Sequence, residues 1–254
     1  MTGTEQLVVL LAGLGAGILS STVGVASLLS FPTLVALGLP PVTANVSNTL
    51  GLIPGGVSGA AGYREELRGA PRLAATILLV CSIGAVAGAG LLLGLPPGVF
   101  ESVVPWLILF TCLLVGVQPR VAAWLRSRAA DARAERLHMS PVTTAFAALT
   151  GVYGGYFGAG AGVMMVAVLG LGTDLELRIV NGLKTVSMMA GNVVAGLIFV
   201  VVADPRWDAV GLLAAGSLVG GYVGARIGRR LPDAVFRGAV VVVGIVAAIA
   251  MLLR

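Results

Sequence analysis

Apolar runs without a single charged side chain alternate with short polar stretches along the whole chain. A helix needs ~20 apolar residues to span a bilayer, and most of these runs reach or approach that length. The pattern therefore predicts an all-α, polytopic integral membrane protein. Runs that contain no Asp, Glu, Lys or Arg include 6–63, 73–100, 102–119, 185–203, 209–225 and 238–253.

The chain also contains an internal duplication. With an offset of 136 residues, 45–118 aligns with 181–254 without a gap, and upstream the offset becomes 134. We therefore expect two homologous repeats, 1–119 and 140–254, joined by an Arg-rich linker at 120–139 within one transmembrane domain. Identical pairs in these two registers include Gly17/Gly151, Gly24/Gly158, Asn45/Asn181, Thr49/Thr185, Pro96/Pro232 and Phe100/Phe236.

Each repeat begins with a long Gly-rich apolar stretch, 7–39 in the first half and 141–171 in the second. At 1.5 Å per residue, a straight helix of ~33 residues would be ~50 Å long, against ~30 Å of hydrocarbon. We therefore expect helices broken at their glycines, so that each stretch either spans twice or enters and returns as a hairpin. Three simple apolar segments follow in each half: 43–62, 73–94 and 100–118, then 178–202, 209–225 and 235–253.

The arginines predict how the repeats face, because cytoplasmic loops carry an excess of Lys and Arg. In the first half, 63–72 is basic and 94–101 has no basic residue. In the second half the order reverses, since 203–208 has one arginine and 226–237 has four. With the linker, which holds five arginines, in the cytoplasm, this reversal predicts inverted repeats in the inner (plasma) membrane with both termini outside. Two parallel repeats, with an accidental reversal of charge, are the alternative.

Composition narrows the class of function. Only 11% of the residues are charged and 57% are hydrophobic, whereas soluble domains are about a quarter charged. A soluble enzyme, a nucleic-acid module and a secreted disulfide scaffold are therefore excluded. The net charge of +5 comes from arginines between apolar runs, which orient spans and do not indicate nucleic acid. Cys81 and Cys112 lie inside apolar segments and are expected to pack there, so no disulfide, metal or cofactor is predicted.

The glycine-rich breaks are the first candidate site. Inside a membrane, irregular backbone survives only where protein buries it or where it lines a cavity. A helix that restarts after a break presents unpaired N–H groups and a positive dipole end, which suit an anion. The alternative is that the glycines let helices pack closely. Their recurrence in both repeats favours the site, with Gly24, Ser27, Gly158, Gly160 and Gly162 as candidate binding residues.

Lys184, the only lysine of the chain, is the second candidate. A charge inside the membrane marks a substrate path by default, although a lysine can also snorkel to the headgroups. Its counterpart in the first repeat is Asn48, so the two halves offer a cation and neutral donors to a small anion. The remaining predicted binding residues are the polar ones around them: Asn45, Thr49, Asn181, Thr185 and Asn192.

Acidic residues are confined to loops and segment ends, so the sequence does not support proton coupling through a buried carboxylate. The spans also lack a Ser/His, Asp/Asp or metal-ligand set, and no Walker-type phosphate loop is present. We therefore expect neither an enzyme nor a protein that hydrolyses ATP by itself.

A loose motif occurs twice, in the same order. The first copy runs from Gly17 to Gly24 and continues through Phe31-Pro32 to Ala44-Asn45, and the second runs from Gly151 to Gly162 and on to Asn181-Gly-Leu-Lys184. In these features the chain resembles the sulfite exporter TauE/SafE family, the toluene sulfonate uptake permeases. One departure is that Ala26 and Ser27 replace part of the first glycine run.

This resemblance implies secondary transport of small sulfur-containing anions such as sulfite, sulfonates or sulfoacetate. In a bilayer, inverted repeats with broken helices would rock to expose a midplane site to each side in turn. An anion channel and a non-transporting membrane partner subunit are the alternatives. The sequence leaves open the anion, the direction of flux, the coupling ion and the oligomeric state, a homodimer included.

Overall fold

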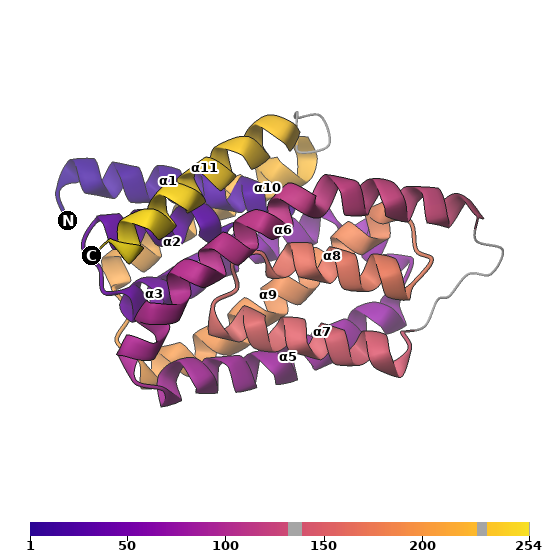
Figure 1. The fold of residues 1–254 in the computed structure, drawn as a ribbon, viewed down its shortest axis with the longest axis horizontal. Helices are drawn as coiled ribbons and strands as arrows, with labels where there is room; N and C mark the ends of the chain where they lie inside the picture. Colours follow the sequence, from indigo (N-terminus) through magenta and orange to yellow (C-terminus); the bar gives the residue numbers. More distant parts are fainter. Residues whose placement is uncertain (132–138, 228–232, 254) are drawn as a thin grey trace.

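Eleven helices make up the part of the protein that the computed structural model describes, residues 1–131, 139–227 and 233–253 (Figure 1). These ranges contain no strand, which confirms the all-α fold class. The helices are α1 (Gly3–Ser21), α2 (Ser27–Ala36), α3 (Pro41–Gly62), α4 (Arg64–Arg68), α5 (Pro71–Gly94), α6 (Pro97–Asp131), α7 (Pro141–Tyr156), α8 (Ala161–Gly172), α9 (Leu177–Val202), α10 (Trp207–Ile227) and α11 (Asp233–Leu252).

Five of the described helices are long and apolar enough to cross a membrane, namely α1, α5, α9, Pro97–Val121 of α6 and Trp207–Arg226 of α10. Although α3 has 22 residues, it is less apolar because it carries Asn45, Ser47 and Asn48, each at most 1% exposed. Protein groups surround these side chains, as polar residues within a membrane require. The structure thus confirms a polytopic helical architecture.

Both Gly-rich stretches are broken helices, as expected. The breaks fall between α1 and α2 and between α7 and α8, where Gly24, Gly158 and Gly160 have φ of 87°, 77° and 78°. A residue with a Cβ is disfavoured in this left-handed region by ~1–2 kcal/mol. With ten and twelve residues, α2 and α8 are ~15–18 Å long and too short to cross ~30 Å of hydrocarbon. Neither stretch therefore contains two helices that each cross the membrane, and each folds as a helix hairpin with a glycine tip.

The two halves interlock. The first helix of each half packs along the third long helix of the other half, α1 on α10 and α7 on α5 (Figure 1). In the same way α3 packs on α10 and α9 on α5, and α3 meets α9 between the two groups. The result is two exchanged bundles, α1–α3–α10 and α5–α7–α9. The remaining long helices, α6 and α11, contact each other and cover α8 and α2 respectively.

Glycines allow the exchanged helices to approach. A Cβ atom on Gly13 would lie 2.7 Å from the Leu213 carbonyl oxygen of α10, and one on Gly84 would lie 2.5 Å from the Ala148 carbonyl oxygen of α7. Such distances are shorter than real Cβ contacts, so only glycine fits. The close-packing alternative is therefore right for those glycines within the helices that face a neighbouring backbone. In the two stretches these are Gly13, Gly17, Gly151 and Gly155.

The first helix of the second half, α7, runs in the opposite direction to α1 (Figure 1). In Figure 1, α1 starts at the end of the molecule that holds both termini, whereas α7 starts at the opposite end. At that opposite end, a Cβ on Gly62 of α3 would lie 2.5 Å from the Ala225 Cβ of α10, and Arg178 Nη2 of α9 pairs with Glu66 Oε1 at 3.3 Å. The arginine-bearing α4 and the end of α10 thus share one end of the molecule.

The beginning of the predicted linker differs from expectation. Instead of ending near residue 119, α6 continues to Asp131, so residues 120–131 are helical. Alanine, leucine and arginine are strong helix formers, and they dominate this stretch. Residues 132–138 of the predicted linker and residues 228–232 of the second half lie outside the described residues.

Candidate functional site

The tips of the two hairpins touch each other. A Cβ atom on Gly24 would lie 3.1 Å from the Gly162 Cα atom and 3.3 Å from the Lys184 Cδ atom. The contact joins the turn before α2, the first turn of α8 and the side of α9. Three residues predicted from separate parts of the sequence therefore meet at one point, where α1 and α7 end and α2 and α8 begin.

Lys184 points into the protein and does not snorkel. Its side chain is completely buried, and its Nζ atom donates to the Thr22 carbonyl oxygen at 2.9 Å. Thr22 is the C-cap of α1, where the negative end of the helix dipole lies. The ammonium therefore stabilises the broken end of α1 and brings a positive charge to the tip contact.

Two further side chains hold the same end of α1. Tyr63 donates its hydroxyl to the Ser21 carbonyl at 3.1 Å, and Gln118 Nε2 of α6 donates to the Val23 carbonyl at 3.3 Å. Together with Lys184, these donors reach three successive carbonyls. Side chains from three different elements thus replace the backbone hydrogen bonds that the break removes.

The asparagines of α3 connect the two halves. Asn45 Nδ2 donates to the Tyr156 carbonyl oxygen at the end of α7, at 2.9 Å. Asn48 Nδ2 donates to Ser27 Oγ at 3.0 Å, and its Oδ1 accepts from Ser30 Oγ, so Asn48 fixes the start of α2. Tyr156 is the counterpart of Thr22 at the offset of 134 residues. The broken end of α7 therefore receives a neutral amide where that of α1 receives an ammonium.

The starts of α2 and α8 supply backbone donors. Within the described chain, the N–H groups of Ser27 and Gly162 donate to no carbonyl or side chain. Both groups belong to the first turn of a helix, where the dipole is positive. Because the two tips touch, these two positive ends lie near each other and near Lys184.

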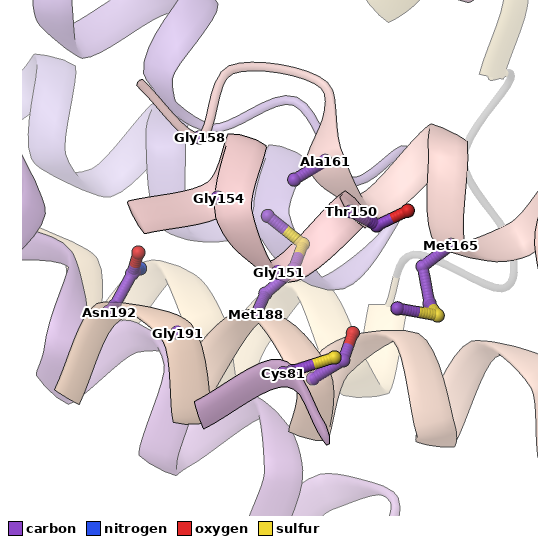
Figure 2. Close-up of a pocket in the computed structure, with 11 residues that line it drawn as sticks. Cys81, Thr150, Gly151, Gly154, Gly158, Ala161, Met165, Met188, Gly191 and Asn192 are labelled. Atoms are coloured by element: carbon purple, nitrogen blue, oxygen red, sulfur yellow. The ribbon is translucent and has the colours of Figure 1, made fainter. Parts of the chain in front are cut away.

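A cavity of about 20 Å³ lies beside the second tip, between α5, α7, α8 and α9 (Figure 2). That volume holds about one water molecule. A Cβ on Gly162 would lie 2.6 Å from Met188 Sδ, so Met188 lies between this cavity and the tip contact. The lining includes the predicted Gly158 and Asn192 together with Cys81, Met165, Met188 and Ser187.

The other predicted residues serve local structure. Thr49, Asn181 and Thr185 donate to carbonyl oxygens four residues earlier in their own helices. Gly160 packs against the methyl group of Thr111 on α6. The Asn192 amide has no hydrogen-bond partner among the described residues, and it lines the cavity.

Several residues of this region escaped the prediction from sequence. Tyr153 donates to the Ala159 carbonyl at 2.6 Å, and Thr111 donates to the same oxygen at 2.9 Å, so the pair fixes the second tip. Gln118 and Tyr63 hold the first tip. The available signal was a polar side chain within an uncharged run or at its boundary, which by itself does not identify the partner.

Comparison with known proteins identifies a family and several relatives of this chain. Residues 9–251 match the sequence model of the family described as “Sulfite exporter TauE/SafE”. A “Probable membrane transporter protein ORF9” from Sinorhizobium sp is 26% identical over 241 residues, covering 93% of this chain and 88% of that protein. No solved structure matches this chain.

Two further relatives carry similar names. A “Probable membrane transporter protein” from Haemophilus influenzae is 24% identical, with 89% of this chain and 86% of the relative covered. The “Probable membrane transporter protein YfcA” of Escherichia coli K12 is 25% identical, with 85% and 76% covered. With a family match over nearly its whole length and several membrane-spanning helices, this multi-pass membrane protein belongs to the sulfite exporter TauE/SafE family of membrane transporters.

Proposed function

We propose that the protein is a secondary transporter of small anions, including sulfur oxyanions such as sulfite and sulfonates, which bind where the two hairpin tips meet. The observation that carries this proposal is the contact of Gly24, Gly162 and the fully buried Lys184. Three sources of positive potential meet there: the ammonium of Lys184 and the first turns of α2 and α8.

The chemistry of the donors suits an oxyanion. Sulfite and sulfonate oxygens accept hydrogen bonds from both ammonium and backbone N–H groups, and hydrogen bonds to charged groups contribute ~1.5–3 kcal/mol each. No Asp or Glu occurs between Glu176 and Asp204 in the sequence that surrounds Lys184. An anion can therefore approach α9 without repulsion from a carboxylate of the same helix.

Transport requires the tips to separate. The cavity beside them holds about one water molecule, so this conformation is closed around the site. Because glycine contacts fix α1 to α10 and α7 to α5, the natural rigid units are the helix pairs α1–α10 and α5–α7. Rocking of these pairs against the central helices α3 and α9 would expose the tips to each side in turn.

The orientation is part of the proposal. The opposite courses of α1 and α7, and the arginine-bearing segments at a single end, support inverted repeats. By the positive-inside rule, that end lies in the cytoplasm and both termini lie outside, in the inner (plasma) membrane.

The test is flux of sulfite or a sulfonate in proteoliposomes. Lys184→Met keeps the length of the side chain but removes its charge, and we expect at least about a tenfold loss of flux, since a charged hydrogen bond to the anion is lost. Lys184→Arg should retain part of the flux. Arg178→Met removes a charge from an exposed position of the same helix and is the matched control.

Unchanged flux in Lys184→Met, with both variants folded, would remove the tip contact from the mechanism. Flux that does not saturate with anion concentration would favour a channel. No flux of any tested anion by the unmodified protein would favour a partner subunit.

A further inference from the structure

The broken ends of α1 and α7 are counterparts but are not stabilised equally. At the end of α1, side-chain donors reach the carbonyls of Ser21, Thr22 and Val23, and the donor to Thr22 is the ammonium of Lys184. The negative end of this helix is therefore met by a full positive charge.

The end of α7 lacks such a charge. The counterparts of those three residues are Gly155, Tyr156 and Phe157. Tyr156 receives the neutral Asn45 amide, whereas the Gly155 and Phe157 carbonyls receive no hydrogen bond from the described residues. The second observation concerns Asn45 itself: it is 1% exposed, and its Oδ1 atom is buried without a partner in the described part of the chain.

Buried oxygen acceptors without donors are rare, because each costs free energy comparable to a lost hydrogen bond. The Gly155 and Phe157 carbonyls lie at the negative end of a broken helix, and the Asn45 amide reaches that end through its bond to the Tyr156 carbonyl. In transporters, half-helix ends and unwound carbonyls coordinate small cations. We propose that the C-terminal end of α7, with Asn45 Oδ1, binds a monovalent metal cation, Na⁺ in the first instance.

The charge of the cation follows from the ligands. All the oxygens are neutral carbonyl or amide atoms, and the sequence places no carboxylate between Glu101 and Asp131 or between Leu137 and Leu171. A divalent cation usually requires carboxylate ligands, whereas a single positive charge at this end would match the ammonium that already occupies the counterpart end at Thr22.

Only the role of the cation in transport rests on the proposed function. If the anion binds at the tips, a cation at the adjacent end of α7 would be the coupling ion, because the same hairpin carries both sites. Binding of the cation itself does not depend on any anion and can be measured separately.

The experiment is thermal unfolding of the purified full chain in NaCl against choline chloride at equal ionic strength, without sulfur anions. Above the dissociation constant, each tenfold rise in Na⁺ should raise the midpoint by about 3 °C or more. Asn45→Leu should abolish this Na⁺-dependent shift, and Asn45→Asp should lower the dissociation constant at least tenfold. Asn181→Leu, the counterpart change on α9, is the control, because Asn181 donates only to its own helix and should leave the shift intact.

A second readout is saturable binding of radioactive Na⁺ to the unmodified protein, which needs no variant to fold. Lys184→Met should keep this binding while losing anion flux, so failure of the anion site and failure of the cation site are distinguishable. Equal midpoints in Na⁺ and choline with no saturable binding, or a full Na⁺ response in Asn45→Leu, would overturn the proposal. In either case, Asn45 Oδ1 would be hydrated and would not be a ligand of a metal cation.

Discussion

The glycines at helix contacts and the glycines at the hairpin tips have different structural roles. Gly84 and Gly88 of α5 have helical backbone and face the backbone of α7, so a Cβ there would collide with main-chain atoms. Gly24 and Gly158 instead have positive φ, and they end one helix so that another can begin. The first kind holds the bundles together, whereas the second kind builds the site.

The two kinds should respond differently to the same substitution. Backbone atoms cannot move aside cheaply, so an added methyl group at an interface should separate two helices and lower stability. At a tip the cost is backbone strain, which is smaller, but it falls on the residues that position the site. Stability should therefore report on the interface glycines, and transport on the tip glycines.

The largest effect is expected from Gly88→Ala. The added Cβ would overlap the Val152 carbonyl oxygen and lie 2.7 Å from the Tyr156 N atom of α7. We expect a loss of about 3 kcal/mol in the free energy of unfolding, at the upper end of overpacking costs. Thermal unfolding in detergent is the measurement. Gly90→Ala, two residues later in the same helix with no atom within 4 Å, is the control and should stabilise by up to about 1 kcal/mol, because alanine favours a helix. Equal stability of the two variants contradicts backbone-to-backbone packing.

A smaller loss of stability, but a larger loss of transport, is expected from Gly24→Ala. The residue has φ of 87° and its Cβ would lie 3.3 Å from Lys184 Cδ, so the variant adds strain of ~1–2 kcal/mol and displaces the lysine. The control is Gly38→Ala, which has φ of 88° but no atom within 4 Å. Both should lose similar stability, and only Gly24→Ala should lose flux in proteoliposomes. Equal flux in both would separate the tip from transport.

The sequence predicted the elements of the fold well, for physical reasons. Charge-free runs of membrane-spanning length are unambiguous, and a duplicated Gly-x-x-x-Gly pattern indicates broken or closely packed helices. The pattern left open which glycines pack against another helix and which break a helix. Gly17 packs on the backbone of α10 and Gly24 has a positive φ, but the two are the same residue in the sequence. The sequence also did not predict that α5 packs in the bundle of the second half and α10 in that of the first, because no local pattern specifies a partner helix.

The candidate site was predicted in part for the same reason. Lys184 could be identified from the sequence alone, because a lysine inside the membrane is energetically costly whatever its partner is. The hydrogen bond of Lys184 to the Thr22 carbonyl depends on tertiary contact. The hydrogen bonds of Thr49 and Thr185 to carbonyls of their own helices depend on side-chain direction. Tyr153 and Thr111 were missed because a lone hydroxyl in an apolar run is equally consistent with a local bond to the preceding turn.

The smallest effect on stability is expected where the two halves differ most. Gly55 of α3 lies against α10, and its Cβ would lie 2.8 Å from the Ser217 carbonyl oxygen. Its counterpart, Gly191 of α9, has no atom within 4 Å, because the cavity separates it from Cys81 of α5, the counterpart of Ser217. The contact between α3 and α10 is thus closed while the equivalent contact between α9 and α5 is open.

In a pair of inverted repeats, the opposite-facing state should exchange these two conformations. We therefore expect Gly191→Ala to change the free energy of unfolding by less than about 1 kcal/mol, and in the stabilising direction, because alanine favours a helix and meets open space. It should nevertheless slow transport, since α5 could no longer close on α9. Flux and thermal unfolding of Gly191→Ala, compared with Gly55→Ala, which should destabilise at once, test this directly. Normal flux in Gly191→Ala would mean that the α5–α9 contact stays open throughout the cycle.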